Sequence, residues 1–351
     1  MKTDIKKHAN IPIFIPHEGC PNGCVFCNQK KITGQCGGSK RDIRPEIENA
    51  LLTIDTSSTD AEIAFFGGSF TGIDKDDMER LLKDAFSYVE KGLVSSVRIS
   101  TRPDYITPEI LETLKKYGVL HIELGIQSAD DGVLLASKRG HTADTAKNAC
   151  RMIIDAGFIL GGQMMIGLPS STPEAEEKTA RMICECGAKE ARIYPTVVFC
   201  ETELCEMAKR GEYIPLNIGD AVKRSAKCFK IFLENGVKVL RVGLQSSENL
   251  SSEREVFGGA NHPALGEMCI SAVYLEIIKE EILKNPESSK GKNTLVIECA
   301  KSEQSKVAGH KKANKNELIS FLDGMGIKIK NIKTAGVDDI SPYRVRTYFS
   351  D

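Results

Sequence analysis

The sequence has no hydrophobic run long enough to cross a membrane. Its longest apolar stretches, such as FILGGQMMIGLP at 158–169, are interrupted by glycine. They are much shorter than the roughly 20 residues of a transmembrane helix. The first ten residues, MKTDIKKHAN, lack the apolar segment of a secretory signal peptide. We therefore expect a cytosolic, cytoplasmic protein with no membrane partner.

Excess charge is absent as well. The formal net charge is −1 over 351 residues, so any attraction to nucleic acid has to come from a local patch. The chain has 12 cysteines, well below the roughly 8–10% of a disulfide-rich scaffold. In a reducing compartment such thiols are free, catalytic or metal-bound.

Short apolar runs alternate with helical segments from about residue 11 to residue 245. The runs are continuous rather than alternating, which favours strands buried on both faces of a parallel sheet. They lie at 11–16, 62–68, 96–101, 121–127, 161–169, 191–198 and 239–245. Repeated strand–helix units of this kind predict an α/β fold, a partial (β/α)6-type TIM barrel.

The pattern changes after about residue 260. We expect there a helix, a strand, a mostly helical segment and a last strand, at 263–285, 294–300, 301–326 and 327–334. The chain is thus predicted to have a barrel core over 1–260 and a small C-terminal α+β appendage over 261–351.

Three cysteines lie on one short loop after the first apolar run. Cys20, Cys24 and Cys27 are separated by three and then two residues, and closely spaced thiolates can bind one metal ion or cluster. A structural zinc site needs a fourth ligand, which Cys36 or His17 could supply. An iron–sulfur cubane held by three cysteines instead leaves one iron open. The missing fourth thiol favours the cubane. Three unligated thiols on such a tight loop are the remaining alternative, and they would be prone to oxidation.

Other chemically interesting motifs also follow the predicted strands. They are GGSF at 67–70, TRPDY at 101–105, QS at 127–128 and GLP at 167–169. In barrels of this type the site lies where strands end and loops begin. The motifs and the predicted architecture therefore agree.

The cysteine spacing, with Phe26 directly before Cys27, resembles the radical S-adenosylmethionine superfamily. The resemblance implies a [4Fe-4S] cluster bound by Cys20, Cys24 and Cys27. It also implies S-adenosylmethionine as a cofactor, bound to the open iron. Reductive cleavage of its sulfonium would then give a 5′-deoxyadenosyl radical, with the protein supplying orientation and solvent exclusion.

A longer series of motifs indicates which members of the superfamily the chain resembles. In order, the chain contains STRPDYITPEIL, LGIQSADDGVL, KRGHTADTAKNACRMIIDAGF, GGQMMIGLPSST, ARIYPTVVF, TELCEMAKRGEYIPL, RVGLQSSENL and NHPALGE. Together, over roughly residues 10–270, they are similar to the radical domain of the elongator catalytic subunit. The same motifs indicate kinship to the oxygen-independent coproporphyrinogen oxidase-like enzymes.

The resemblance also implies further cofactor-binding residues. Gly67, Gly68 and Ser69 would hold the methionyl group, and Gln127 and Arg139 would line the site. The full set implied is Phe26, Gly67, Gly68, Ser69, Gln127, Arg139, Gln163 and Arg192. The alternatives are ordinary: a hydrogen-bonded polar core pair for the two glutamines, and a surface ion pair for Arg139.

The chain departs from the elongator pattern in three ways. Its first two cysteines are closer together. Ser100 stands where a glutamate is usual, which removes a carboxylate that could hold ribose or sulfonium. The sequence ends near residue 351, without room for an acetyltransferase domain, so we do not expect acetyl-CoA chemistry to carry over.

A local cluster of lysines is the main indication that the protein binds RNA. Residues 284–333 hold eleven lysines against five acidic residues. Lys306, Lys311, Lys312 and Lys315 could form one cationic helix face for phosphates. The same lysines could also be a plain solvated face, and no aromatic single-strand-binding motif accompanies them.

The function predicted is a radical S-adenosylmethionine enzyme that modifies tRNA. Its partners would be tRNA and a reductant such as flavodoxin or ferredoxin. A second possibility is a small-molecule or tetrapyrrole substrate. A third is a non-catalytic RNA-binding protein with zinc on Cys20, Cys24, Cys27 and Cys36.

Overall fold

A computed structural model describes residues 7–15, 18–20, 23–28, 38–244, 255–284 and 292–351. The chain divides into two compact units. The first comprises residues 1–217 and 231–261, and the second residues 218–230 and 262–351. The predicted domain boundary at residue 260 stays a prediction. Within the described ranges, no helix is both long enough and apolar enough to cross a bilayer.

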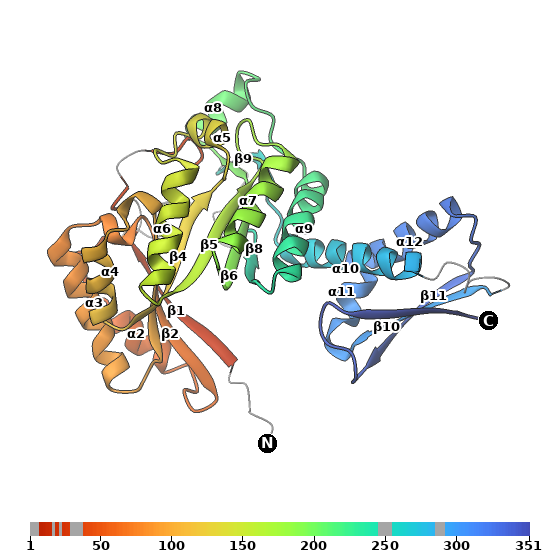
Figure 1. The fold of residues 1–351 in the computed structure, drawn as a ribbon, viewed down its shortest axis with the longest axis horizontal. Helices are drawn as coiled ribbons and strands as arrows, with labels where there is room; N and C mark the ends of the chain where they lie inside the picture. The colour runs from red at the N-terminus through yellow and green to blue at the C-terminus, as the bar shows by residue number, and fades with distance from the viewer. Residues whose placement is uncertain (1–6, 16–17, 21–22, 29–37, 245–254, 285–291) are drawn as a thin grey trace. The chain divides into compact units, whose positions relative to one another are not determined.

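A curled sheet of seven parallel strands forms the first unit (Figure 1). In spatial order they are β1 (Lys7–Ile15), β2 (Thr59–Gly67), β3 (Ser96–Thr101), β4 (Val119–Gln127), β5 (Ile159–Ile166), β6 (Glu190–Pro195) and β8 (Lys238–Val242). The strand order follows the chain, as successive right-handed strand–helix crossovers require. The predicted partial TIM barrel is confirmed.

Helices connect the strands and cover one face of the sheet (Figure 1). They include α2 (Arg44–Leu51), α3 (Lys75–Glu90), α4 (Pro108–Lys116), α5 (Asp131–Ala136), α6 (Ala143–Asp155), α7 (Pro173–Glu185) and α8 (Glu203–Lys209). Their starts are encoded locally: the Asp74 side chain accepts hydrogen bonds from the first turn of α3, and Thr107 caps α4 just before Pro108.

The predicted strand at 191–198 consists of two strands. β6 ends at Pro195, and β7 (Val197–Phe199) leaves the barrel sheet to pair antiparallel with β9 (Val256–Gly259). A proline supplies no backbone N–H for a sheet ladder, so it commonly marks a strand end. β7 leads into α8, where Leu204 N donates to Val25 O in the cysteine loop.

The two faces of the curled sheet differ in chemistry. Residues such as Ile63, Ile99 and Ile122 are fully buried on the apolar side. On the other side, Arg98 on β3 donates to Glu62 on β2 at 2.7 Å and to Glu190 on β6 at 2.6 Å. Residues two apart on a strand share a face, so the continuous apolar pattern predicted burial but not the charged network.

This network is tightly paired. Burial alone would raise the pKa of Glu190, but hydrogen bonds from His121 and Arg98 bring that pKa down to about 2. Arg98 also donates to Glu123 on β4 at 3.1 Å, and both side chains are about 1% exposed. Buried charges are tolerated when they are paired in this way, so the network joins four strands beneath the site.

The second unit contains a three-stranded sheet in the order β11 (Asn331–Val337), β10 (Thr294–Ala300), β12 (Val345–Ser350). Its helices include α10 (Leu265–Lys284), α11 (Gln304–Ala308) and α12 (Ala313–Gly324). Tyr274, Ile297 and Leu322 are among the residues of its own hydrophobic core. The predicted α+β appendage is confirmed.

The expectation that 327–334 forms the last strand is wrong, because β12 follows it. β12 pairs antiparallel with β10 and has Phe349 buried but Tyr348 exposed. It is a short edge strand with a polar outer side, which gives little apolar signal in the sequence. β11 itself begins only at Asn331.

Candidate cofactor site

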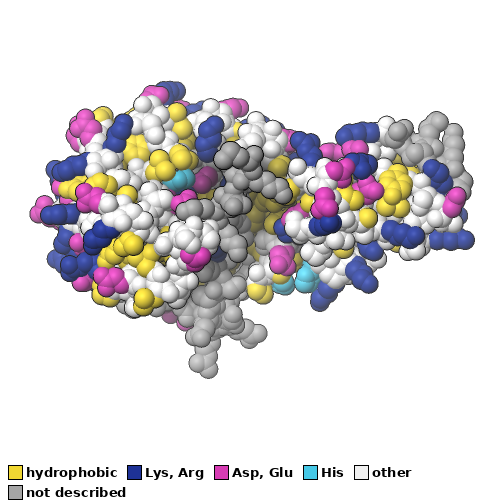
Figure 2. Space-filling model, turned by 90° about the horizontal axis from the view of Figure 1, so that it is seen from below, with side chains coloured by type: hydrophobic (Ala, Val, Ile, Leu, Met, Phe, Trp, Pro, Cys, Tyr) yellow, Lys and Arg dark blue, Asp and Glu magenta, His cyan; other side chains and the backbone are white. Residues whose placement is uncertain are grey.

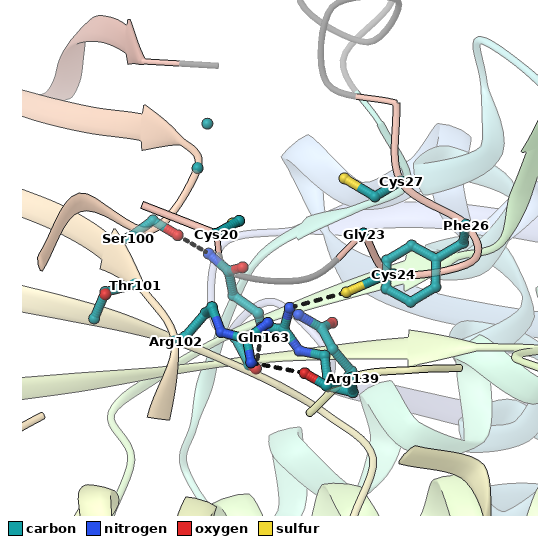
Figure 3. A pocket seen from close by; sticks show the side chains of 14 residues that line it. Cys20, Gly23, Cys24, Phe26, Cys27, Ser100, Thr101, Arg102, Arg139 and Gln163 are labelled. Carbon is teal, nitrogen blue, oxygen red and sulfur yellow. Dashed lines mark hydrogen bonds between the residues drawn. The ribbon is translucent and has the colours of Figure 1, made fainter. Parts of the chain in front are cut away.

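A cavity lies at the carboxyl ends of the barrel strands, where the loops after β1 to β4 meet Gln163 of β5 (Figure 3). This is the position at which (β/α) barrels carry their active sites. The residues that line it are Cys20, Gly23, Cys24, Phe26, Cys27, Gly67, Gly68, Ser100, Thr101, Arg102, Gly125, Gln127, Arg139 and Gln163. Nine of the sequence-predicted site residues are thus brought together: Cys20, Cys24, Cys27, Phe26, Gly67, Gly68, Gln127, Arg139 and Gln163.

All three predicted cluster cysteines line this cavity. A backbone hydrogen bond from Cys27 N to Cys24 O, 3.0 Å long, closes a tight turn between two of them. Among the residues that the structure describes, no three His, Cys, Asp or Glu side chains surround one ion position. A cubane does not require that arrangement, because each cysteine binds a different iron. The alternative zinc ligands Cys36 and His17 lie outside the described residues.

The segment between the cysteines is held from both sides. Val25 N donates to Ser137 O at 3.2 Å, and Leu204 N on α8 donates to Val25 O at 2.8 Å. The Val25 side chain is buried against Val198 and Tyr213. The β7–α8 connection therefore fixes the cysteine loop to the barrel by one hydrogen bond and by apolar packing.

Glycines allow the loops after β1 and β2 to approach closely. Gly67 has a φ of +115°, and a Cβ there would lie 2.7 Å from Ile15 O. Gly68 N donates to Ile15 O at 2.8 Å, and Ser69 N donates to Glu18 O at 3.0 Å. Side chains larger than hydrogen would separate these loops, so the two glycines are required for the shape of the cavity wall.

Ser69 lies outside the cavity lining. It is fully buried, and its hydroxyl is 2.8 Å from Thr101 Oγ1 and accepts from Arg102 N at 3.2 Å. Thr101 is the last residue of β3 and Arg102 follows it, so Ser69 joins the loop after β2 to the end of β3. These contacts hold the Ser69 hydroxyl within the protein, and its part in cofactor binding stays a prediction.

Arg139 is a buried residue rather than a surface one, being 7% exposed. Its guanidinium donates to Gly125 O at 2.8 Å and to Cys24 Sγ at 3.5 Å, while Nε is buried without a partner in the described structure. Gln127, at the end of β4, has a φ of +66°. Such a backbone is strained for a non-glycine residue, and strain of this kind at a cavity wall is typical of functional positions.

The cavity floor comes from β3, β4 and β5. Gln163 Nε2 donates to Ser100 Oγ at 3.1 Å and to Glu123 Oε2 at 2.8 Å. Ser100 and Glu123 are register partners on adjacent strands. Position 100 has a hydroxyl rather than a carboxylate, but its register partner Glu123 has one. Both groups accept hydrogen bonds from the Gln163 amide and orient it.

Arg192 does not line the cavity but lies beside its floor. It donates to Glu123 Oε1 at 2.9 Å, and its guanidinium carbon lies 5.3 Å from the centre of the Phe66 ring. Its partner is a protein carboxylate, so its part in cofactor binding stays a prediction.

The sequence analysis singled out the TRPDY motif but assigned no role to its Arg102. This side chain is 2% exposed, yet it lines the cavity next to the cysteines (Figure 3). It donates to both oxygens of Asp104 at 2.9 Å and to Arg139 O at 2.7 Å. An arginine directly after a strand, with an aspartate two residues later, was the available signal.

The surroundings of the thiols are electropositive. Burial raises the pKa of Cys20, while the nearby Arg139 and Arg102 guanidinium groups act to lower it. Burial and the neighbouring Arg139 also lower the pKa of His141 to about 4. His141 is therefore neutral near pH 7, whereas Arg102 and Arg139 both place positive charge near Cys20.

The four lysines predicted to form one cationic helix face do not do so. The helix is broken at Gly309, which has a φ of +82°, so α11 and α12 are separate. Lys306 pairs with Glu303 at 2.9 Å, and Lys315 donates to Ile332 O at 3.0 Å. Lys311 and Lys312 are exposed in the connecting turn, both with positive φ. Figure 2 shows Lys and Arg side chains of this unit interspersed with acidic ones on the visible face.

The fold and the site agree with the comparisons to known families. The chain matches the family described as the radical SAM superfamily over residues 14–183, and the radical SAM C-terminal domain over residues 188–274. It belongs to the radical S-adenosylmethionine superfamily. This family implies S-adenosylmethionine and a [4Fe-4S] cluster as cofactors.

Within the superfamily the chain is similar to elongator-type proteins. It is 26% identical over 255 residues to a tRNA uridine(34) acetyltransferase of Methanocaldococcus jannaschii, covering 61% of this chain and 47% of that protein. It is 27% identical over 248 residues to Elongator complex protein 3 of Homo sapiens, covering 62% and 45%. The chain therefore spans about half the length of these curated relatives.

A solved structure shares the fold. The archaeal Methanocaldococcus infernus Elp3 with an N-terminal deletion superposes with a TM-score of 0.60 at 21% identity, covering 79% of this chain and 64% of that one.

Proposed function

We propose that this protein is a radical S-adenosylmethionine enzyme whose [4Fe-4S] cluster is held by Cys20, Cys24 and Cys27. The observation that carries the proposal is that all three cysteines of one loop line a single cavity at the strand ends. The two unpartnered buried guanidinium nitrogens near them, on Arg102 and Arg139, suit an anionic group in that cavity. When bound, the reduced cluster supplies the electron that cleaves the sulfonium and gives a 5′-deoxyadenosyl radical.

The residues of this chain bind and orient the cofactors. Gly67 and Gly68 offer backbone that a methionyl group can approach closely. Gln127 and Arg139 lie on the wall formed after β4, and Gln163 presents its amide from the floor. Phe26 adds an apolar ring to the lining and helps to exclude water.

The proposed substrate is tRNA, modified in the cytoplasm with electrons from a flavodoxin- or ferredoxin-type donor. Two lines of support are the similarity to proteins named as tRNA uridine(34) acetyltransferase and Elongator complex protein 3, and the exposed pair Lys311 and Lys312. In this proposal residues 1–260 are the catalytic core, and residues 261–351 contribute to RNA binding.

Mass spectrometry of nucleosides from digested tRNA tests the substrate. Cells that lack the protein should lose one modified nucleoside, and the wild-type gene should restore it, whereas a gene encoding Cys24→Ala should not. An unchanged set of tRNA nucleosides in the deletion strain would refute the tRNA assignment.

Neutralising Lys311 and Lys312 together should weaken tRNA binding and flatten its dependence on salt. Each phosphate contact contributes close to one unit to the slope of log K against log salt, so we expect the slope to fall by about 1 to 2. The measurement is a binding titration at several salt concentrations with the Lys311→Gln/Lys312→Gln protein. Lys83→Gln/Lys178→Gln, which removes two exposed lysines from helices of the barrel, is the matched control. Equal slopes for all three proteins would show that the turn does not bind phosphate.

A further inference from the structure

Arg102 is a buried cation with an unusual set of partners. One edge of its guanidinium is fixed by the Asp104 carboxylate, with two contacts of 2.9 Å, and Nη2 also donates to the carbonyl of Arg139 at 2.7 Å. The remaining nitrogen, Nη1, is buried and has no hydrogen-bond partner in the described structure. A buried N–H left unpaired is costly, so the site is expected to hold an acceptor for it.

The position of this cation points to the cysteine loop. Arg102 lines the same cavity as Cys20, Cys24 and Cys27 (Figure 3). It is close enough to interact electrostatically with two of the three thiols, Cys20 and Cys24. Its counter-ion Asp104 has a side chain 27% exposed, so that carboxylate is partly solvated. The Asp104 carboxylate therefore pairs with the Nε and Nη2 edge of the Arg102 guanidinium, and Nη1 is left to interact with a negative group in the cavity.

A purely structural role is the alternative. Arg102 ties the loop after β3 to the loop before α6, because it contacts both Asp104 and the Arg139 carbonyl. That role uses only Nε and Nη2 of the guanidinium. It does not account for Nη1, which is buried without a partner in the described structure.

We propose that Arg102, oriented by Asp104 and by the Arg139 carbonyl, sets the electrostatic environment of the cluster through its positive charge. The inference rests on the proposed function. Reduction adds one electron, taken from a low-potential one-electron donor, to a cluster held by three thiolates. A fixed guanidinium close to that charge stabilises the reduced form, and so favours electron entry.

A redox titration of the reconstituted full-length protein, followed by electron paramagnetic resonance, tests this directly. Arg102→Gln should lower the equilibrium constant for reduction about tenfold, which corresponds to a potential about 59 mV lower. Arg102→Lys keeps the charge and should stay near the wild-type value. Asp104→Asn removes the counter-charge and should shift the potential in the opposite direction. Arg181→Gln, an exposed arginine on α7, should change nothing.

The outcomes separate the two roles. Equal shifts in Arg102→Gln and Arg102→Lys, or no shift in either, would overturn the inference while leaving the cluster assignment intact. If Arg102→Gln does not retain a cluster, an unshifted or lowered potential in Asp104→Asn overturns it. A wild-type protein that binds no cluster would instead refute the proposed function itself.

Discussion

Replacing Cys24 with alanine should remove the iron–sulfur absorbance and the cleavage of S-adenosylmethionine together. Cys24 is nearly buried, lines the cavity and accepts a hydrogen bond from Arg139 at 3.5 Å. With this residue gone, only two thiolates of the loop remain for a cluster that needs at least three. We expect iron per reconstituted chain to fall to background, measured beside the absorbance of the same sample.

Cys184→Ala is the matched control for this experiment. Cys184 is a partly exposed thiol on α7 and does not line the cavity. Burial raises its pKa to about 11, so it is protonated and a poor ligand at neutral pH. Its variant should keep full iron content. Unchanged iron in Cys24→Ala would refute the assignment of Cys24 as a cluster ligand.

Replacing Glu123 with alanine should have the largest effect on stability. Glu123 is 1% exposed and accepts hydrogen bonds from Arg98, Arg192 and Gln163. Its removal leaves two buried guanidinium groups with less negative charge beside them. Breaking a buried ion pair from one side typically costs about 3–5 kcal/mol, and we expect a loss of unfolding free energy in that range by urea titration of the cluster-free protein.

The control for Glu123 is a salt bridge at the surface. Glu212 pairs with Arg210 at 2.7 Å, and the side chains of the arginine and the glutamate are 54% and 53% exposed. Exposed pairs of this kind contribute much less to stability than buried ones, so Glu212→Ala should change the unfolding free energy little. A similarly small change for Glu123→Ala would mean that the inner network does not depend on this carboxylate.

The fold could be predicted largely because strand burial leaves a local signal. The barrel strands contain mostly apolar runs, and the helices α3 to α8 each begin at a side-chain N-cap, so these elements could be located from local sequence. The exceptions depend on tertiary context. Pro195 ends β6 and frees β7 for a separate pairing with β9, and β12 is an edge strand with an exposed Tyr348.

The candidate site was only partly predictable, for the same reason. The three cysteines are close together in sequence, and both they and the Gly67–Gly68 pair follow predicted strands, which indicated that they would meet at the strand ends. Ser69 and Arg192 bind other protein groups, and these partners could not be read without the strand register. Glu123 and Arg102 were assigned no role because their importance comes from contacts across strands and loops. The prediction of one lysine-rich helix face was wrong because Gly309 has a positive φ and ends α11.

The central claim is that three cysteines of one loop hold a cubane with one iron free for S-adenosylmethionine. The most direct measurement is anaerobic reconstitution followed by reduction in the presence of S-adenosylmethionine, with 5′-deoxyadenosine quantified by mass spectrometry. We expect a brown protein with about four irons per chain that releases 5′-deoxyadenosine only when reduced. A colourless protein with one tightly bound zinc and no 5′-deoxyadenosine would contradict it.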